Sequence, residues 1–514
     1  MKIFSAILLL CCVHALSAAP ILILNGTVVT SEGSHPGWDV LIEDGKIAMV
    51  GPKVEPIPRD ARIIDASGKY VMPGGIDPHT HLEMPFMGQE ACDDFKSGQE
   101  AALAGGTTMH IDFALPVNGD LAAGFELYKK KSAKSVMDFG FHMAVTAWND
   151  QVAEDMSTLA KLGINSFKFF LAYKGALMVT DEEFQQGLQQ CKKIGAVAMV
   201  HAENGDAVAN GQKAMIEKGI VGPEGHALSR PAVLEGEATG RAIKLAKYVN
   251  TPLYVVHVMS IDAMEEVAKA RREGQRVIGE AVASGITQDE SKMWDPDFKI
   301  AAQFVMSPPI RSKEHQGALI HGLVDESLTI IATDHAVFNS TQKAKGKPPQ
   351  ADFRTLPNGV NGIEERMHVT WDVLVNSGRI SPSAYVSITS AEAAKVFNIF
   401  PQKGHIAPGS DADVIIFDPT VEHTISATTH HSRMDTNIYE GYTMKGKVVT
   451  TISQGNIVWE NEKLNTVEGA GRYIKMEPFG YLFDELDKLE PAPKPYGPTP
   501  VPRDYGSSEN KDEL

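Results

Sequence analysis

The chain has 514 residues, of which 43% are hydrophobic and 22% are charged, a composition typical of a folded globular protein. This length allows several domains, or one large α/β barrel with an accessory domain. The 48 basic and 65 acidic residues give a formal net charge of −17. Nucleic-acid binding requires grouped Lys and Arg side chains that neutralise phosphates, so this acidic chain is not expected to bind nucleic acid.

Both ends of the chain have the sequence pattern of a targeting signal. Residues 1–18 combine Lys2, an apolar run from Ile3 to about Leu16, and small residues, which is the pattern of a secretory signal peptide. A buried helix or a membrane anchor is the alternative, but the run is short for a span of ~20 residues. Residues 511–514 read KDEL, the signal bound by the KDEL receptor. We therefore expect a protein of the endoplasmic reticulum lumen, with no membrane span after signal cleavage.

Few cysteines remain once residues 1–18 are removed. Cys11 and Cys12 are lost, and Cys92 and Cys191 stay. Two cysteines cannot build a disulfide framework or a cysteine-rich zinc site, so a large core must stabilise the fold. Two sequons, at Asn25 and Asn339, are candidates for glycosylation in the lumen.

Short segments rich in Val and Ile stand at both ends of the remaining chain. Residues 19–72 include ILILNGTVVT and DVLIEDGKIAMVG, and residues 406–475 include DADVIIFDP and GKVVTTISQGNIVWENEKL. Such segments around glycine turns predict strands, with turns at Asp44-Gly45 and Gln454-Gly455. Neither block is long enough to make a convincing domain alone. We therefore expect one β-sandwich domain formed from the N- and C-terminal segments together.

Residues 73–405 alternate between short apolar runs and helix-period segments such as Asp181 to Ile194 and Ser260 to Glu273. The eight runs are GGIDPHTHL, GTTMHIDFA, GFHMAVTA, NSFKFFLA, AVAMVHAE, PLYVVHVM, RVIGEAV and LTIIATDH. Eight such alternations predict an α/β fold, a (β/α)₈ TIM barrel, although a doubly wound sheet alternates in the same way. Residues 476–514 are rich in proline and are expected to form an extended tail ending in KDEL.

Metal-binding residue types stand at the ends of four of these runs. His79 and His81 end the first run, His201 the fifth, His257 the sixth and Asp334 the eighth. Residues i and i+2 of a strand point to the same side, so both imidazoles of the first run can reach one metal ion. Each residue alone is more often an ordinary polar residue at a strand end. Four strand ends that converge on the active-site face of a barrel predict a metal site.

Lys168 lies in the fourth run and, if this run is a strand, points opposite to Phe167 and Phe169. Burying a lysine is unfavourable unless it is neutral or paired, so a partner carboxylate or an amine that reaches solvent would account for it. The other interpretation is that the amine has reacted with CO₂. The resulting carbamate is an anion whose two oxygens can bridge two metal ions. It also offsets their charge, which an ammonium would increase.

The sequence resembles the hydantoinase/dihydropyrimidinase family of the amidohydrolase superfamily, over about Ile21 to Tyr473. The strings that carry the resemblance are, in order, HTH, FKFFLAYK, HAEN, HVMS, MSPPIR, TDH and PNGVNGIEER. The resemblance implies a (β/α)₈ barrel with a β-sandwich from both termini. It also implies a homotetramer, and two Zn²⁺ ions per subunit bridged by a carboxylated lysine and a hydroxide.

The resemblance also assigns roles to single residues. His79, His81, Lys168 and Asp334 would hold the more buried metal ion, and Lys168, His201 and His257 the second. Tyr173 would donate to the oxyanion, Asp334 would act as base and then acid, and Ser307 and Asn358 would contact the ring amides. From the sequence alone, Tyr173 can equally be a core aromatic residue, and Ser-Pro-Pro and Asn-Gly are turn signals. Ala336 departs from the family, whose members usually carry Cys there.

The implied activity is hydrolysis of the cyclic amide bond of 5,6-dihydrouracil and dihydrothymine to N-carbamoyl-β-amino acids, the second step of reductive pyrimidine catabolism. One alternative is the same chemistry on hydantoin, allantoin or a xenobiotic imide. Another is a non-catalytic, dihydropyrimidinase-related scaffold. Such scaffolds lack the metal ligands, whereas this sequence has all four histidines, the lysine and the aspartate.

Overall fold

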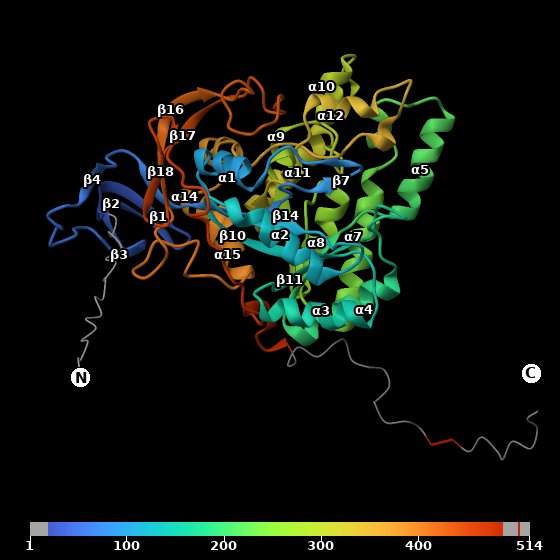
Figure 1. Cartoon of the computed structure of the whole chain (residues 1–514), viewed down its shortest axis with the longest axis horizontal. Coiled ribbons are helices and arrows are strands. Elements are labelled where there is room, and N and C mark those ends of the chain that lie inside the picture. The colour runs from blue at the N-terminus through green and yellow to red at the C-terminus, as the bar shows by residue number, and fades with distance from the viewer. Residues whose placement is uncertain (1–18, 487–501, 504–514) are drawn as a thin grey trace, which may run out of the picture.

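A computed structural model of the chain describes residues 19–486 and 502–503. The predicted signal peptide and the KDEL sequence lie outside these residues. In the described part, eight parallel strands form one sheet, and strands from the two ends of the chain form another. Figure 1 shows the strands of the second sheet, blue and orange-red, together at one side of the barrel.

The eight-stranded sheet is the predicted barrel, and each strand lies in one of the eight predicted runs, except that β10 begins two residues before its run. Neighbouring strands pair in chain order, which a doubly wound sheet would not do. A parallel bridge between Thr80 and His335 joins the two ends of the sheet. The (β/α)₈ prediction is therefore confirmed. The strands are β6 (Gly75–Thr80), β9 (Thr107–Ala114), β10 (Asp138–Val145), β11 (Ser166–Phe170), β12 (Val197–His201), β13 (Leu253–Val255), β14 (Val277–Val282) and β15 (Ile330–Ala332).

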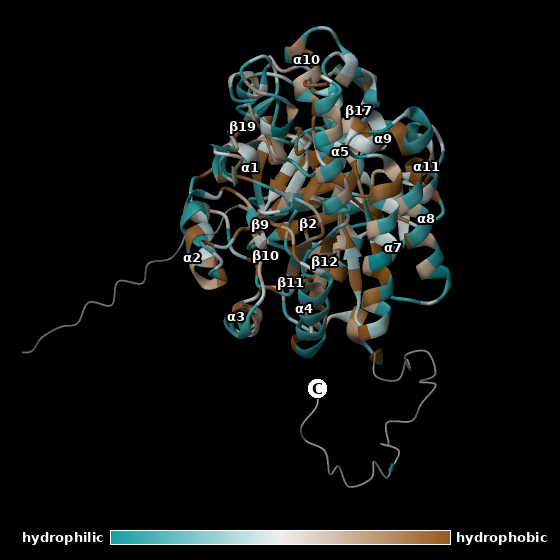
Figure 2. Ribbon diagram, turned by 90° about the vertical axis from the view of Figure 1, so that its right-hand side faces the viewer, coloured by the Kyte–Doolittle hydropathy of each residue, from teal (hydrophilic) through white to brown (hydrophobic). Residues whose placement is uncertain are grey.

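Helices surround these strands, and the local sequence explains where they begin and end. The helix predicted from Asp181 to Ile194 has these same bounds. Thr180 and Glu183 form a capping box at its start, and Gly195 ends it with φ of 70°. Ser260 caps the next predicted helix. In Figure 2 hydrophobic colour gathers in the interior, while the outer helices carry much of the hydrophilic colour.

The α-helices are α1 (Phe95–Ala104), α2 (Leu121–Lys131), α3 (Asp150–Lys161), α4 (Asp181–Ile194), α5 (Gly205–Glu217), α6 (Glu224–Leu228), α7 (Ala232–Val249), α8 (Ile261–Arg272), α9 (Ala283–Thr287), α10 (Phe298–Gln303), α11 (Lys313–Val324), α12 (Ser340–Lys343), α13 (Arg366–Thr370), α14 (Pro382–Val386) and α15 (Glu392–Val396). Within the described residues, no helix is both long and apolar enough to cross a membrane.

The second sheet combines both ends of the chain, as predicted. Its strands are β1 (Ile21–Thr30), β2 (Gly33–Glu43), β3 (Lys46–Gly51), β4 (Arg62–Asp65), β5 (Tyr70–Pro73), β16 (Val414–Thr424), β17 (Thr443–Ser453), β18 (Asn456–Glu460) and β19 (Lys463–Leu464). Antiparallel pairing of β5 with β16 joins the two halves. Their side chains also share one core, in which Val40 and Val71 pack with Ile416 and Ile452. The residues at which this domain passes into the barrel stay a prediction.

The two predicted glycine turns explain the hairpins of this sheet. Asp44 and Gly45 connect β2 to β3 with φ of 51° and 75°. Gln454 and Gly455 connect β17 to β18 with φ of 52° and 76°. Two successive positive φ angles define the turn whose twist matches a hairpin.

A buried charge cluster joins the barrel to the terminal sheet. The Lys403 Nζ lies 2.5 Å from a carboxylate oxygen of Asp138, 2.9 Å from one of Asp411 and 2.5 Å from one of Asp413. Asp138 begins barrel strand β10, whereas Asp411 and Asp413 immediately precede β16. Arg472, close to the C-terminal end, adds a second cation 2.6 Å from Asp138. Ionic contacts therefore fix the terminal sheet against the barrel.

The first residues of the predicted tail are packed against the barrel. Met476 is fully buried, and its N–H donates to the carbonyl of Gly163. The N–H of Phe479 donates to the carbonyl of Gly195, after the end of α4. The tail therefore starts with a docked segment, up to residue 486 in the described part.

Candidate metal centre and active site

The predicted metal ligands lie together at the carboxyl ends of the barrel strands. His79 and His201 stand at the ends of β6 and β12, and Lys168 lies inside β11. His257 follows β13 by two residues, and Asp334 follows β15 by two. All five, and His81 with them, are buried. The barrel therefore brings together residues that span more than 250 positions of sequence.

Asp334 is the meeting point of the first group. One of its oxygens, Oδ1, lies 3.1 Å from His79 Nε2 and 3.1 Å from His81 Nε2. Two nitrogen ligands of one tetrahedral zinc ion lie about 3.3 Å apart when each Zn–N distance is ~2.0–2.1 Å. The three side chains are thus spaced as ligands of a single cation. The neighbouring histidines hold the pKa of Asp334 well below its usual range despite its burial, so the carboxylate is charged.

His201 and His257 form the second group. The nearest nitrogens of the two rings, His201 Nδ1 and His257 Nε2, lie 2.9 Å apart. In the first group, the buried Nε2 of His79, which lies close to Asp334, has no hydrogen-bond partner among the described residues. Buried polar atoms are normally satisfied. Imidazole nitrogens that converge in this way fit a metal site.

Lys168 is fully buried in a pocket of aromatic rings. Its Nζ lies 4.5 Å from the ring centre of Phe113 and 5.1 Å from that of Phe170. Burial lowers the pKa of Lys168 to about 8, although the charges of Asp334 and Glu280 oppose this. The neutral amine, which is the form that reacts with CO₂, is therefore more abundant near neutral pH than in an exposed lysine.

Three residues of the site have a backbone conformation that residues other than glycine rarely adopt. The φ angle is 63° at Tyr173, 37° at His257 and 53° at Asp334. Such angles are unfavourable for residues other than glycine and cluster at functional sites. Each of these residues follows the end of a strand, where the turn of the chain directs its side chain into the site.

Glu280, in the middle of β14, supports both groups and was not predicted as a site residue. Its carboxylate accepts hydrogen bonds from His79 Nδ1 at 2.7 Å, the backbone N–H of His257 at 2.8 Å and the Tyr254 hydroxyl at 2.7 Å. Although burial disfavours a charged imidazole, Glu280 and Asp334 raise the pKa of His79 to about 9. A carboxylate behind a ligating histidine fixes the orientation of its ring. An acidic residue inside an apolar strand was the available sequence signal.

Glu203 plays the equivalent part for His201. Its Oε2 lies 2.9 Å from His201 Nε2 and accepts a hydrogen bond from Arg230 at 2.7 Å. Burial opposes the charged carboxylate, but Arg230 and His201 lower the pKa of Glu203 to about 2. The guanidinium of Arg230 also lies 5.7 Å from the ring centre of Tyr173.

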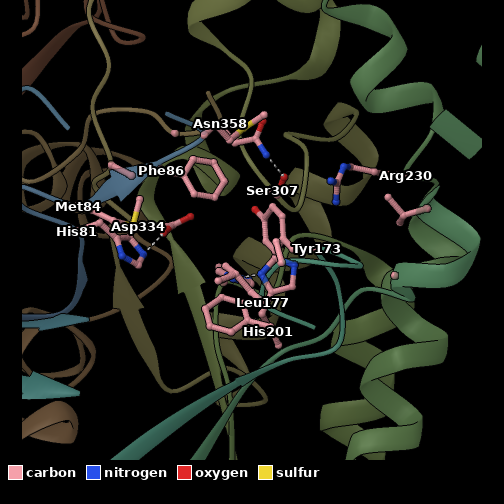
Figure 3. A pocket seen from close by; sticks show the side chains of 18 of the residues that line it. His81, Met84, Phe86, Tyr173, Leu177, His201, Arg230, Ser307, Asp334 and Asn358 are labelled. Atoms are coloured by element: carbon pink, nitrogen blue, oxygen red, sulfur yellow. Dashed lines mark hydrogen bonds and ion pairs between the residues drawn. The ribbon is translucent and has the colours of Figure 1, made fainter. Parts of the chain in front are cut away.

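The residues predicted to contact the substrate line the same cavity (Figure 3). Asn358 Nδ2 donates to Ser307 Oγ at 3.0 Å, and Tyr173 points its hydroxyl toward this pair. Burial raises the pKa of Tyr173, so the phenol keeps its proton and can donate it in a hydrogen bond.

The cavity has a volume of about 450 Å³, the size of a small-molecule site. One wall is apolar and includes Met84, Phe86 and Leu177. Phe86 belongs to the short hairpin of β7 (Pro85–Phe86) and β8 (Gln89–Glu90), and Met84 directly precedes this hairpin. The predicted metal ligands also line the cavity, as does Ala336. A small molecule fits such a cavity.

Comparison with known proteins gives the family. The model of the amidohydrolase family matches residues 70–458. This chain belongs to the amidohydrolase family. It is 60% identical over 475 residues to a dihydropyrimidinase of Arabidopsis thaliana, covering 92% of this chain and 88% of the relative. It is 47% identical over 466 residues to the dihydropyrimidinase of Rattus norvegicus, covering 89% of each chain.

Solved structures also resemble this chain in both sequence and fold. The crystal structure of dihydropyrimidinase from Brevibacillus agri is 43% identical, with a TM-score of 0.87 over 90% of this chain and 99% of that chain. A D-hydantoinase (dihydropyrimidinase) from Thermus sp. is 34% identical, with a TM-score of 0.86 over 89% of this chain and 99% of that chain. The predicted family and fold are confirmed, while the roles of the single site residues stay predictions.

Proposed function

We propose that this protein opens the ring of 5,6-dihydrouracil and dihydrothymine by hydrolysing the cyclic amide bond, giving N-carbamoyl-β-amino acids. One observation carries the proposal. Four histidines, a lysine and an aspartate converge at the active-site end of a barrel whose relatives, up to 60% identical, are named dihydropyrimidinases. The reaction would be the second step of reductive pyrimidine catabolism.

The site would hold two Zn²⁺ ions per subunit. Imidazole nitrogens and carboxylate oxygens are suitable ligands for zinc. His79, His81 and Asp334 would bind one ion, His201 and His257 the other, and Lys168 both. For Lys168 to bridge them, its neutral amine attacks CO₂, forming an N–C bond and releasing a proton, which leaves a carbamate anion. When bound, the two cations would lower the pKa of a water molecule so that it is a nucleophile at neutral pH.

The protein's own groups would move the protons. Asp334 is charged and lies at the centre of the ligand cluster, so its carboxylate can accept the proton of the attacking water. It would then return this proton to the ring nitrogen as the amide bond breaks, acting as base and then as acid. Tyr173, protonated because burial raises its pKa, would donate a hydrogen bond to the oxyanion of the tetrahedral intermediate. Ser307 and Asn358 would orient the ring amide.

The test is a comparison of substrates with protein purified in the presence of zinc and bicarbonate. Ring opening of 5,6-dihydrouracil, hydantoin and allantoin is followed in parallel, and metal content is measured on the same sample. We expect the highest kcat/KM for dihydrouracil. No turnover of any ring by protein that carries both metal ions would contradict the proposal.

Hydantoin opening is the second candidate. The likeness to D-hydantoinases supports it, since one solved D-hydantoinase has a TM-score of 0.87 and 41% identity over 90% of this chain. A higher kcat/KM for hydantoin than for dihydrouracil would establish this alternative and leave the proposed mechanism unchanged.

We also propose, from the terminal sequence patterns, that the protein acts in the endoplasmic reticulum lumen, retained by the KDEL receptor, and, from the family resemblance, that it is a homotetramer. Deleting residues 511–514 should then cause secretion into the medium. Sedimentation of the purified protein should give four times the mass of the mature chain. Retention of the shortened protein would contradict the localisation, and a monomer would contradict the tetramer.

A further inference from the structure

Lys343 is a buried lysine whose amine, among the described residues, hydrogen-bonds to backbone carbonyls and forms no ion pair. It ends the short helix α12 and is 2% exposed. Its Nζ donates to the carbonyl oxygens of Ala302 at 3.0 Å, Val305 at 3.2 Å and Gly359 at 2.8 Å. These three bonds use all three donors of an ammonium group.

The carbonyls of Val305 and Gly359 belong to the two loops that carry Ser307 and Asn358, and that of Ala302 belongs to helix α10, which precedes the Ser307 loop. Val305 precedes Ser307 by two residues, and Gly359 directly follows Asn358. The loops also contact each other directly, because the N–H of Gly359 donates to the Val305 carbonyl at 2.8 Å. The Asn358 side chain then donates to Ser307 Oγ at 3.0 Å (Figure 3). The ammonium therefore lies behind the pair of side chains that faces the cavity.

The position of the second loop leaves little room for adjustment. Gly359 has φ of 145°, and a Cβ atom there would lie 2.0 Å from the carbonyl oxygen of Ala336. Ala336 follows the proposed base, Asp334, by two residues. A shift of the Gly359 carbonyl away from Lys343 would therefore move Asn358 relative to both Ser307 and Asp334.

Lys403 provides an internal comparison, since it is equally buried. Its ammonium faces three carboxylates, whose charges raise the pKa of Lys403 although burial lowers it. At Lys343, burial instead lowers the pKa to about 7. An ammonium without a nearby anion is unfavourable for stability. The presence of a buried lysine at position 343 is thus better explained by the loops that it holds in place than by a gain in folding stability.

We infer that Lys343 is a positioning residue for the substrate site, and that it holds the Ser307 loop and the Asn358 loop in register for the ring amide. This inference rests on the proposed function, in which these two side chains orient the substrate. Lys343 itself does not touch the substrate.

A double-mutant cycle tests the inference. Lys343→Met removes the donors but keeps the apolar stem, and Asn358→Ala removes one of the groups that it positions. We expect Lys343→Met to lower kcat/KM for dihydrouracil by roughly tenfold or more, mainly through KM, with the metal content of the unchanged protein. In the Asn358→Ala background the same substitution should change kcat/KM by less than about threefold, because the positioned group is gone.

The matched control is Lys345→Met. Lys345 is exposed, two residues away, with its Nζ 2.8 Å from Gln89 Oε1, and its substitution should leave kcat/KM within about twofold. If Lys343→Met does not accumulate as folded protein, Lys343→Gln, whose neutral amide still offers two donors, takes its place in the cycle. Equal effects of the Lys343 substitution with and without Asn358 would overturn the inference, as would activity equal to that of the control. If the unchanged protein opens no cyclic amide, the proposed function has failed instead.

Discussion

Replacing Lys403 by methionine should destabilise the protein by about 4–5 kcal/mol at pH 7, because a buried ion pair that loses one partner typically costs 3–5 kcal/mol. The upper part of this range applies because the Lys403 ammonium, with a side chain only 1% exposed, is shared by three carboxylates within 2.9 Å. Arg472 stays next to Asp138 and keeps the loss from being larger.

Lys46→Met is the matched control, since Lys46 pairs with the same Asp411 at 2.5 Å but its side chain is 47% exposed. An exposed pair contributes at most ~1 kcal/mol. Both free energies of unfolding are measured by urea denaturation followed by circular dichroism. A loss in Lys403→Met that is no larger than in the control would refute the reasoning.

The pH dependence gives a second check on the same cluster. Burial raises the pKa of Asp413 even beside Lys403, and removal of the cation should raise it further. A carboxyl group whose pKa is higher in the folded than in the unfolded state stabilises the folded protein at low pH. This stabilisation is lost as pH rises through the folded-state pKa. The loss in free energy of unfolding caused by Lys403→Met should therefore be larger at pH 8 than at pH 5. An equal deficit at both values would show that the carboxylates do not carry the effect.

The remaining predictions concern the metal centre. Lys168→Ala should lose tight metal binding and activity together, and retention of both ions, measured by mass spectrometry of the metals, would rule out the carbamate. Tyr173→Phe should lower kcat by about 10²–10³-fold, as the loss of an oxyanion donor does, with unchanged metal content; an unchanged kcat would exclude the assigned role. Glu280→Gln should weaken metal affinity by about 10–100-fold in a chelator competition, and unaltered affinity would show that the carboxylate does not orient His79. Removal of metal by a chelator should abolish ring opening, and added Zn²⁺ should restore it; activity that survives verified removal would contradict a metal-dependent reaction.

Local sequence signals predicted the elements of the fold well. The apolar runs that end in His79, His201 and Asp334 are strands or their immediate continuations, and the α4 helix has its predicted bounds. These features depend on side-chain period, capping and turn residues, which act over a few positions. The convergence of the candidate site residues could be predicted as well, because all parallel strands of a barrel end on the same face.

The supporting groups depend on contacts between distant segments and were not predicted. Glu280 meets His79 across 201 positions of sequence, and Lys343 meets Ala302 across 41. A period within a strand shows that a side chain is buried, but it does not identify the group from another strand that it meets. The docking of Met476 was missed for the same reason, since its contacts lie on the base of a barrel that only the folded chain creates.

The pairing of β5 with β16 also sets the order of events during synthesis. The ribosome must make residues 74–413 between these strands, which takes on the order of 20–70 s at ~5–20 residues per second. During that time the edge of β5 that will pair with β16 has no partner strand from the other end of the chain. The terminal sheet is thus completed last, and a chain interrupted before Val414 would keep an open strand edge, the kind of surface on which aggregation begins.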